Sequence, residues 1–168
     1  MLLKPVFALA LLAVPAIAAS AGAPVFGSVV VIGGSASDIA LDESRGFLYV
    51  ANMGASVIDV MSTADNTIRS AMNVLPFPGA IALSPDSQYL LIAHYCNAGP
   101  TGPPCANAIT SVHLTDNSKQ TFLLTDAPLG LAFLKSGQAL VITTKAILSM
   151  DPVSGQTQLV ETIANLAL

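Results

Sequence analysis

Two cysteines near the middle of the chain have the most distinctive side-chain chemistry in the sequence. Cys96 and Cys105 bracket eight residues rich in glycine and proline. In an oxidising compartment, two cysteines that flank such a loop most simply form a disulfide. Closing a loop this short contributes about 2.5–3 kcal/mol in the chain-entropy model. The alternative is a pair of free thiols, whereas covalent haem is excluded because the sequence has no C-x-x-C-H motif.

The two histidines are the next candidates for chemistry. His94 directly precedes Tyr95 and Cys96, where an imidazole could ligate a metal or act as a base. The favoured interpretation is a polar strand end, because His94 occupies the place of Asn52 and Thr144 in an internal repeat. His113 also lies at the end of a predicted strand, and the same interpretation applies to it.

Other catalytic patterns are missing from the sequence. Two cysteines and two histidines at this spacing match no structural zinc site. The carboxylates stand mostly in predicted turns, where aspartate caps backbone amides, and the neighbours Asp42 and Glu43 do not form a general acid/base dyad. Nucleophile-elbow, S-x-x-K, dinucleotide and P-loop motifs are not found. The sequence therefore predicts no catalytic residue, no metal and no cofactor.

Composition limits the classes of partner. The 168 residues are 53% hydrophobic and 10% charged, with a formal net charge of −4. Such a chain has enough apolar material for the core of one ordinary domain. The basic residues are scattered singly along the sequence: Lys4, Arg45, Arg69, Lys119, Lys135 and Lys145. We therefore expect no basic patch and no nucleic-acid partner.

The first residues have the features of a secretory signal peptide. Lys4 is followed by an apolar run over residues 5–19 and by small residues at Ala16-Ile17-Ala18. An uncleaved membrane anchor and a buried core helix are the alternatives, but the run is short for a spanning helix and contains Pro15. The prediction is a signal peptide over residues 1–21 and a mature chain over 22–168. That chain is then exported, periplasmic or extracellular, and has no membrane span.

The mature chain contains an internal repeat. Residues 39–52, 81–94 and 131–144 align without gaps, and each copy holds two strand-length apolar runs around a polar turn. Two further strands are predicted after each copy. Four short strands in every 40 to 50 residues are typical of a β-propeller blade. A β-sandwich and a parallel β-helix fit the repeat less well.

The predicted fold is therefore all-β, a propeller-like array of about three four-stranded blades that forms an incomplete ring. The blade repeats cover approximately residues 36–75, 78–125 and 128–165, and residues 24–32 form an orphan outer strand. A closed propeller has about 4 to 8 blades. We expect either that the chain is the N-terminal part of a longer protein or that two chains associate to close the ring.

Particular residues resemble a known family. The run Tyr49-Val50-Ala51-Asn52 with the following Ser56-Val57-Ile58-Asp59, and the segment Ile81-Ala82-Leu83-Ser84-Pro85-Asp86, resemble the repeat of YVTN-type bacterial β-propellers. The resemblance covers about residues 36–163. It implies an exported, often seven-bladed propeller whose relatives include lactonases and surface-layer repeat proteins. No lactonase motif is found here, so the resemblance carries over no catalytic residue.

The blade topology places candidate binding residues together. One face carries the ends of the second strands and the Cys96–Cys105 segment, and loop-rich faces are favoured for binding. Its candidates are Asn52, Met53, His94, Tyr95, Thr144 and Lys145. The opposite face carries Asp42, Glu43, Arg45, Asp86 and Lys135. The predicted function is an exported scaffold that binds a protein or small molecule. The alternatives are part of a lactonase-like or dehydrogenase-like propeller enzyme and a structural surface-layer repeat.

Overall fold

The computed structural model describes residues 27, 29–96 and 105–163, and this part of the chain folds into three four-stranded antiparallel sheets. The all-β, blade-like architecture predicted from the repeat is confirmed. The predicted signal peptide and most of the segment between the two cysteines lie outside the described residues.

The first sheet runs in chain order from its inner to its outer strand. It contains β1 (Ala36–Asp42), β2 (Phe47–Asn52), β3 (Val57–Ser62) and β4 (Ile68–Asn73). The reversal before β2 places Gly46 at a φ of 69°, a left-handed conformation that glycine adopts without steric cost. Successive strands are therefore joined by short polar turns, as the repeat predicts.

The second and third sheets repeat this order. The second contains β5 (Pro78–Leu83), β6 (Tyr89–His94), β7 (Ala108–His113) and β8 (Ser118–Leu123). The third contains β9 (Pro128–Phe133), β10 (Ala139–Thr143), β11 (Ala146–Met150) and β12 (Thr157–Thr162).

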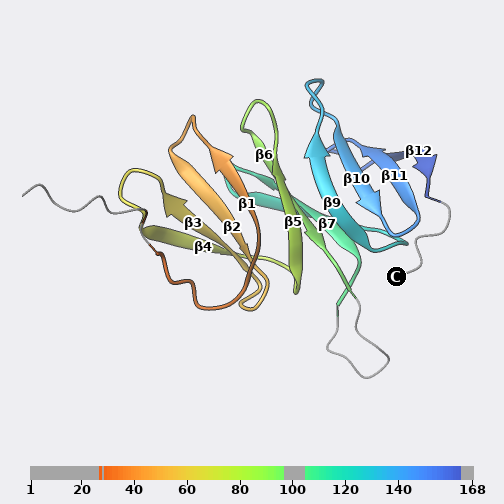
Figure 1. Cartoon of the computed structure of the whole chain (residues 1–168). Helices are drawn as coiled ribbons and strands as arrows, with labels where there is room; N and C mark the ends of the chain where they lie inside the picture. Colours follow the sequence, from red (N-terminus) through yellow and green to blue (C-terminus); the bar gives the residue numbers. More distant parts are fainter. Residues whose placement is uncertain (1–26, 28, 97–104, 164–168) are drawn as a thin grey trace, which may run out of the picture.

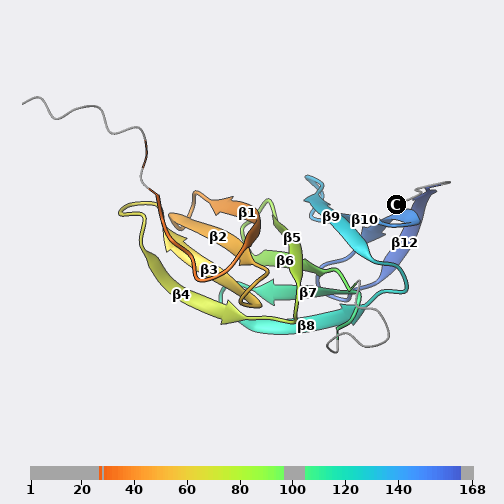
Figure 2. The ribbon, with the colours of Figure 1, turned by 60° about the horizontal axis from the view of Figure 1, so that its bottom comes forward.

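The three sheets stand side by side in an arc. The innermost strands β1, β5 and β9 are neighbours along the concave side, and β4 and β8 lie along the convex side (Figure 2). The turns that join β1 to β2, β5 to β6 and β9 to β10 all lie at the top of Figure 1. The ends of β2, β6 and β10 therefore lie at the opposite end of the sheets.

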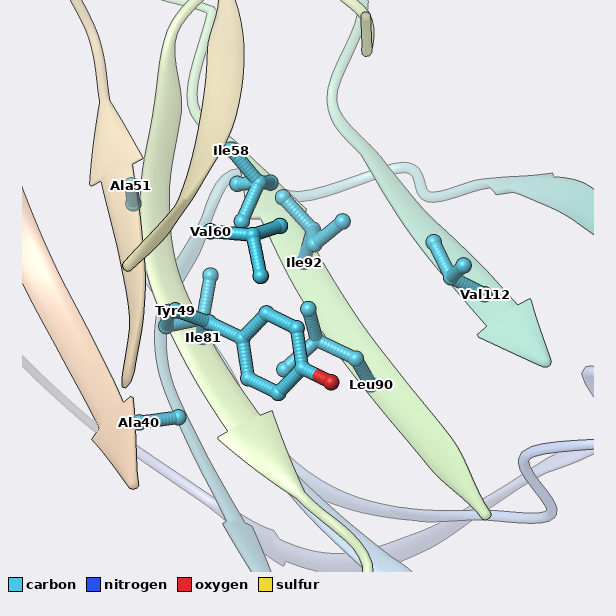
Figure 3. Packing of buried hydrophobic residues seen from close by; sticks show 9 residues of the cluster. All are labelled: Ala40, Tyr49, Ala51, Ile58, Val60, Ile81, Leu90, Ile92 and Val112. Carbon is cyan, nitrogen blue, oxygen red and sulfur yellow. The ribbon is translucent and has the colours of Figure 1, made fainter. Parts of the chain in front are cut away.

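Two apolar layers hold the arc together. The first layer joins Tyr49 and Ile58 of the first sheet to Leu90 and Ile92 of the second (Figure 3). The second layer joins side chains from both later sheets: Leu91, Ala93, Ile109, Ala139, Val141 and Met150. Burying one large aliphatic side chain contributes about 1.5–3 kcal/mol, so these layers are the main stabilising contacts between sheets.

The middle sheet shows why second strands have little polar alternation. Leu90, Leu91, Ile92 and Ala93 of β6 are all fully buried, because consecutive side chains meet different neighbouring sheets. In β10 the side chain of Ile142 is instead 43% exposed, on the face that no other described sheet covers. The continuous apolar run thus reflects burial on both faces.

The predicted outer strand over residues 24–32 is only partly described. Residues 27 and 29–32 have no strand pairing in the structure, and Val29 and Val31 are exposed. The following residues 33–35 lie against the first sheet, where the backbone amide of Met53 donates to the carbonyl of Ser35 at 2.8 Å.

Candidate functional site

The connections between strands lie at two opposite ends of the array. We call the end that carries Asn52, His94, Thr143 and the following connections the loop face. We call the opposite end, with the turns before β2, β6 and β10 and the turns after β3, β7 and β11, the turn face. The six predicted binding residues lie on or next to the loop face, and Arg45 and Asp86 lie on the turn face, as the topology predicts.

A buried polar pair closes the loop face of the first sheet. The Asn52 amide donates from Nδ2 to Oδ2 of Asp59 at 2.9 Å, and its Oδ1 accepts from the backbone amide of Ala55 at 3.2 Å. Both side chains are buried. Gly34 lies so close that a Cβ there would sit 2.0 Å from the Asn52 carbonyl oxygen. The segment that contains Gly34 therefore covers the Asn52–Asp59 pair, and the pair holds this end of the first sheet in place.

His94 anchors the second sheet in a similar way. Its imidazole is fully buried, with Nε2 2.9 Å from the hydroxyl of Thr110 and Nδ1 3.3 Å from the carbonyl of Pro76. The hydroxyls of Thr110 and Thr121 are in turn 3.2 Å apart. Burial lowers the pKa of His94, although the carbonyls of Pro76 and Leu75 oppose that effect. The favoured interpretation of His94 as a polar strand end therefore agrees with its surroundings.

The predicted disulfide is present on the loop face. Cys96 and Cys105 are joined, and their Cα atoms are 5.5 Å apart. The backbone amide of Cys96 also donates to Oδ1 of Asn107 at 3.0 Å. The crosslink and this hydrogen bond fix the two ends of the long connection between β6 and β7.

The third sheet turns sharply at its loop face. The Thr143 hydroxyl donates to the carbonyl of Ala146 and accepts from the backbone amides of Lys145 and Ala146, which closes the short hairpin between β10 and β11. The Lys145 ammonium is 3.0 Å from the carboxylate of Asp126. A cleft of about 240 Å³ lies beside this hairpin, bordered by Leu123, Asp126 and Thr143 among others.

The structure divides the six predicted binding residues into two groups. Asn52 and His94 are buried and hydrogen-bonded within the fold, so their side chains offer no contact surface. Met53 and Lys145 are exposed, and Tyr95 and Thr144 are half-buried. Sequence reasoning missed Asp59 and Thr110, the buried partners of Asn52 and His94. For Asp59 the available signal was a charged residue inside an apolar strand, whereas Thr110 lies next to Ser111 and gave no such signal.

Carboxylates on the turn face cap their own turns. Oδ1 of Asp86 accepts from the Ser84 hydroxyl at 2.5 Å, and this bond lowers the pKa of Asp86. Oδ1 of Asp151 accepts from the backbone amides of Val153 and Ser154, and the Ser154 amide contributes most to the lowered pKa of Asp151. These contacts confirm the capping role expected from the sequence.

Three of the basic residues that are scattered along the sequence come together in the fold. The basic residues are scattered along the sequence, but Arg45, Arg69 and Lys119 border a single cleft between the first and second sheets. Arg45 comes from the turn before β2, Arg69 from β4 and Lys119 from β8. The side-by-side packing of two blades brings together strands that are about 50 residues apart in the chain.

The search for a metal site and for a membrane span covers only the described residues. Among residues 27, 29–96 and 105–163, no three His, Cys, Asp or Glu side chains are grouped in a way that could hold a metal ion. The same part of the chain contains no helix of the length and apolar character needed to cross a bilayer.

Comparisons with known proteins identify the fold alone. No family model matches the sequence, and no curated protein is similar to it. The structure is similar to that of the nidogen/laminin complex, with a TM-score of 0.64, 20% identity, and 76% of this chain and 49% of that chain covered. The structure is also similar to that of the RRP9 WD40 repeats, with a TM-score of 0.63 and 15% identity. That match covers 81% of this chain and 40% of the RRP9 chain.

An enzyme is also among the similar structures. Kuenenia stuttgartiensis hydrazine synthase gives a TM-score of 0.63 at 17% identity, and the match covers 84% of this chain and 39% of that one. The chain has a propeller-type repeat fold. It spans less than half the length of each of these three proteins. Since WD40 proteins are β-propellers, the fold predicted from the internal repeat is supported.

Proposed function

We propose that the chain is an exported scaffold of the YVTN type whose loop face binds a protein partner. The observation that carries this proposal is the combination of a fixed base and an exposed rim on that face. The base is fixed by the disulfide and by the buried side chains of Asn52 and His94. The rim presents Met53 and Lys145, which are exposed.

The chemistry of the rim suits a protein surface. Leu123, at the end of β8, is 75% exposed and borders the small cleft beside the Lys145 hairpin. Exposed apolar residues are common at protein–protein contacts, whose buried cores are enriched in Met and aromatic residues. We propose that a partner contacts Met53, Tyr95, Thr144 and Lys145. The buried residues Asn52 and His94 position this surface.

Export and the YVTN assignment rest on separate support. Tyr49-Val50-Ala51-Asn52 lies in β2, where Tyr49 and Ala51 pack into the layer between the first two sheets. A disulfide persists in oxidising compartments, in agreement with a periplasmic or extracellular protein. The intact mass of the native product tests export: loss of 18 to 21 N-terminal residues is expected, and an uncleaved N-terminus would contradict it.

Site-specific photo-crosslinking in the source cells tests the binding face. A benzophenone amino acid is placed at Met53 or Lys145, and the matched control is placed at Val153, an exposed turn-face residue. We expect a discrete adduct from the two loop-face positions that unlabelled chain competes away. Equal labelling from Val153 would contradict the proposal, and turnover of a lactone by the purified protein would favour the enzyme alternative.

A further inference from the structure

The cleft between the first two sheets has features that the scaffold function does not use. It measures about 530 Å³, and its lining includes Arg45 of a turn-face turn, Arg69 of β4 and Lys119 of β8. Clefts of roughly 300–1,000 Å³ hold small-molecule ligands in other proteins. This cleft is large enough for a ligand with several carbon atoms.

The rim of the cleft is cationic. Arg45, Arg69 and Lys119 line it, and no carboxylate does. They are three of the five cations in the described residues, in a chain whose formal net charge is −4. The acidic partners of the two arginines, Asp42 and Asp65, do not line the cleft. Each arginine charge is thus balanced by an aspartate outside the cleft, whereas Lys119 forms no ion pair within the described residues.

The cationic side chains keep donors available. Arg45 contacts Asp42 and the carbonyl of Ser87 through Nη1 alone, and Arg69 contacts Asp65 through Nη2. A guanidinium has five N–H donors, so most of them are unused in these contacts. Lys119 Nζ donates to the carbonyl of Asn73 at 2.7 Å, which holds the ammonium at the rim and leaves two of its three protons.

The wall of the cleft contains a buried tyrosine whose hydroxyl has no partner among the described residues. The Tyr49 ring is only 4% exposed, yet Tyr49 lines the cleft. Every fully buried side-chain oxygen in the described part of the chain has a hydrogen bond, so the Tyr49 hydroxyl, which has none there, keeps some exposure. Figure 3 shows its oxygen pointing away from Ala51 and Ile58.

The tyrosine is suited to donating a hydrogen bond. Burial raises the pKa of Tyr49, the nearby Asp42 carboxylate raises it further, and Arg45 opposes both effects. The phenol therefore keeps its proton at neutral pH. The remaining wall combines the apolar residues Phe47, Met72 and Leu114 with the polar residues Ser70, Asn73 and Asn117.

We infer that this cleft binds a small organic carboxylate with an apolar body. Arg69 and Lys119 bind the carboxylate, since a guanidinium matches its two oxygens in a bidentate geometry. Phe47, Met72 and Leu114 take the apolar body out of water. The Tyr49 hydroxyl donates to a ligand oxygen. The site lies on the face opposite the proposed protein contact, so the two proposals stand independently.

Calorimetric titration of the full, oxidised chain with 4-phenylbutyrate tests the site. The matched neutral probe is 4-phenylbutan-1-ol, which has the same apolar body and no charge. We expect saturable binding of the carboxylate and at least about tenfold weaker binding of the alcohol, because charge-assisted hydrogen bonds are lost. Absence of saturable carboxylate binding up to about 10 mM, or equal binding of both probes, would overturn the inference.

Variants locate the binding. Arg69→Gln and Lys119→Gln are each expected to weaken 4-phenylbutyrate binding by about tenfold, and Tyr49→Phe by a smaller factor. Lys135→Gln removes the same charge from a turn-face residue outside the cleft and is expected to leave the affinity unchanged. Equal losses in Lys135→Gln and Arg69→Gln would show a general charge effect and would overturn the site. Arg45 is left intact because it pairs with the buried Asp42.

Discussion

The buried polar side chains of the loop face and the cationic side chains of the turn-face cleft behave in different ways. On the loop face, Asn52, His94 and Thr143 are buried and bonded to partners inside the fold. On the turn face, Arg69 and Lys119 are at the surface and keep free donors at the rim of a cleft. The buried polar groups of the loop face hold the sheets in place, and the cationic groups at the rim of the cleft are available to a ligand.

This difference shows that the longest loop and a binding cleft can lie at opposite ends of the same strands. The loop face carries the long connection between β6 and β7 that holds the Cys96–Cys105 disulfide, yet the larger of the two clefts described above lies at the other end of the strands. The cleft arises because two blades pack side by side and leave a space between β4 and β8. We therefore expect mutations of the buried polar residues on the loop face to affect stability, and mutations of the cationic cleft residues on the turn face to affect binding of a small carboxylate.

Removal of the disulfide is expected to have the largest effect on stability. Cys96→Ser should lower the free energy of unfolding by about 2.5–3 kcal/mol under oxidising conditions, because it frees a loop closed across nine positions. Chemical denaturation with and without reductant measures this. The wild-type chain in reductant should match the variant, and an equal loss in the variant under both conditions would contradict the role of the crosslink.

Loss of the buried Asn52 amide should lower the free energy of unfolding somewhat less than loss of the disulfide. Asn52→Ala leaves Asp59 buried without its donor and is expected to lower the free energy of unfolding by about 2 kcal/mol. The turn-face counterpart is Arg69→Gln, which breaks an ion pair between two exposed side chains and should cost less than about 0.5 kcal/mol. Urea denaturation of both variants measures the contrast, and similar losses would remove the distinction between the faces.

The smallest expected effect is a pH dependence that originates at the loop face. Burial holds the pKa of His94 below its ordinary value of 6.5, so the unfolded chain binds a proton more readily than the folded one. The stability from neutral His94 is complete above pH 6.5 and falls as the pH drops below it. Thermal denaturation at pH values from about 7.5 to 5 should show a falling Tm.

A matched pair of histidine variants isolates this effect. His94→Gln should remove that part of the pH dependence, whereas His113→Gln should keep it, because His113 is partly exposed and lies beside Asp116 on the turn face. The same pH dependence in the wild type and in His94→Gln would show that another group is responsible.

The fold was predictable because the apolar runs of the repeat mark the strands that are buried. The ungapped copies at residues 39–52, 81–94 and 131–144 correspond to the two inner strands of each sheet. The apolar run of β6 indicated burial on both faces, and the sequence also predicted the disulfide. These features depend on local pattern or on short sequence separation.

The cleft was not predictable in the same way. Arg69 and Lys119 are about 50 residues apart, and only the packing of one blade on the next brings them to one rim. Asp59 appeared in the sequence as one polar residue in an apolar strand, which indicates a buried partner but does not identify it. Tyr49 belongs to the family-like run, and nothing in that run shows that its hydroxyl is unpaired.

The central claim is that the turn-face cleft receives a ligand while the polar groups of the loop face are satisfied internally. Two-dimensional ¹H–¹⁵N spectra of the oxidised chain, recorded during titration with 4-phenylbutyrate, test it for both faces at once. The predicted result is saturable shifts at Ala71, Met72 and Lys119, with none at Met53 or Lys145. Shifts centred on the loop-face residues, with the cleft residues unchanged, would contradict the claim.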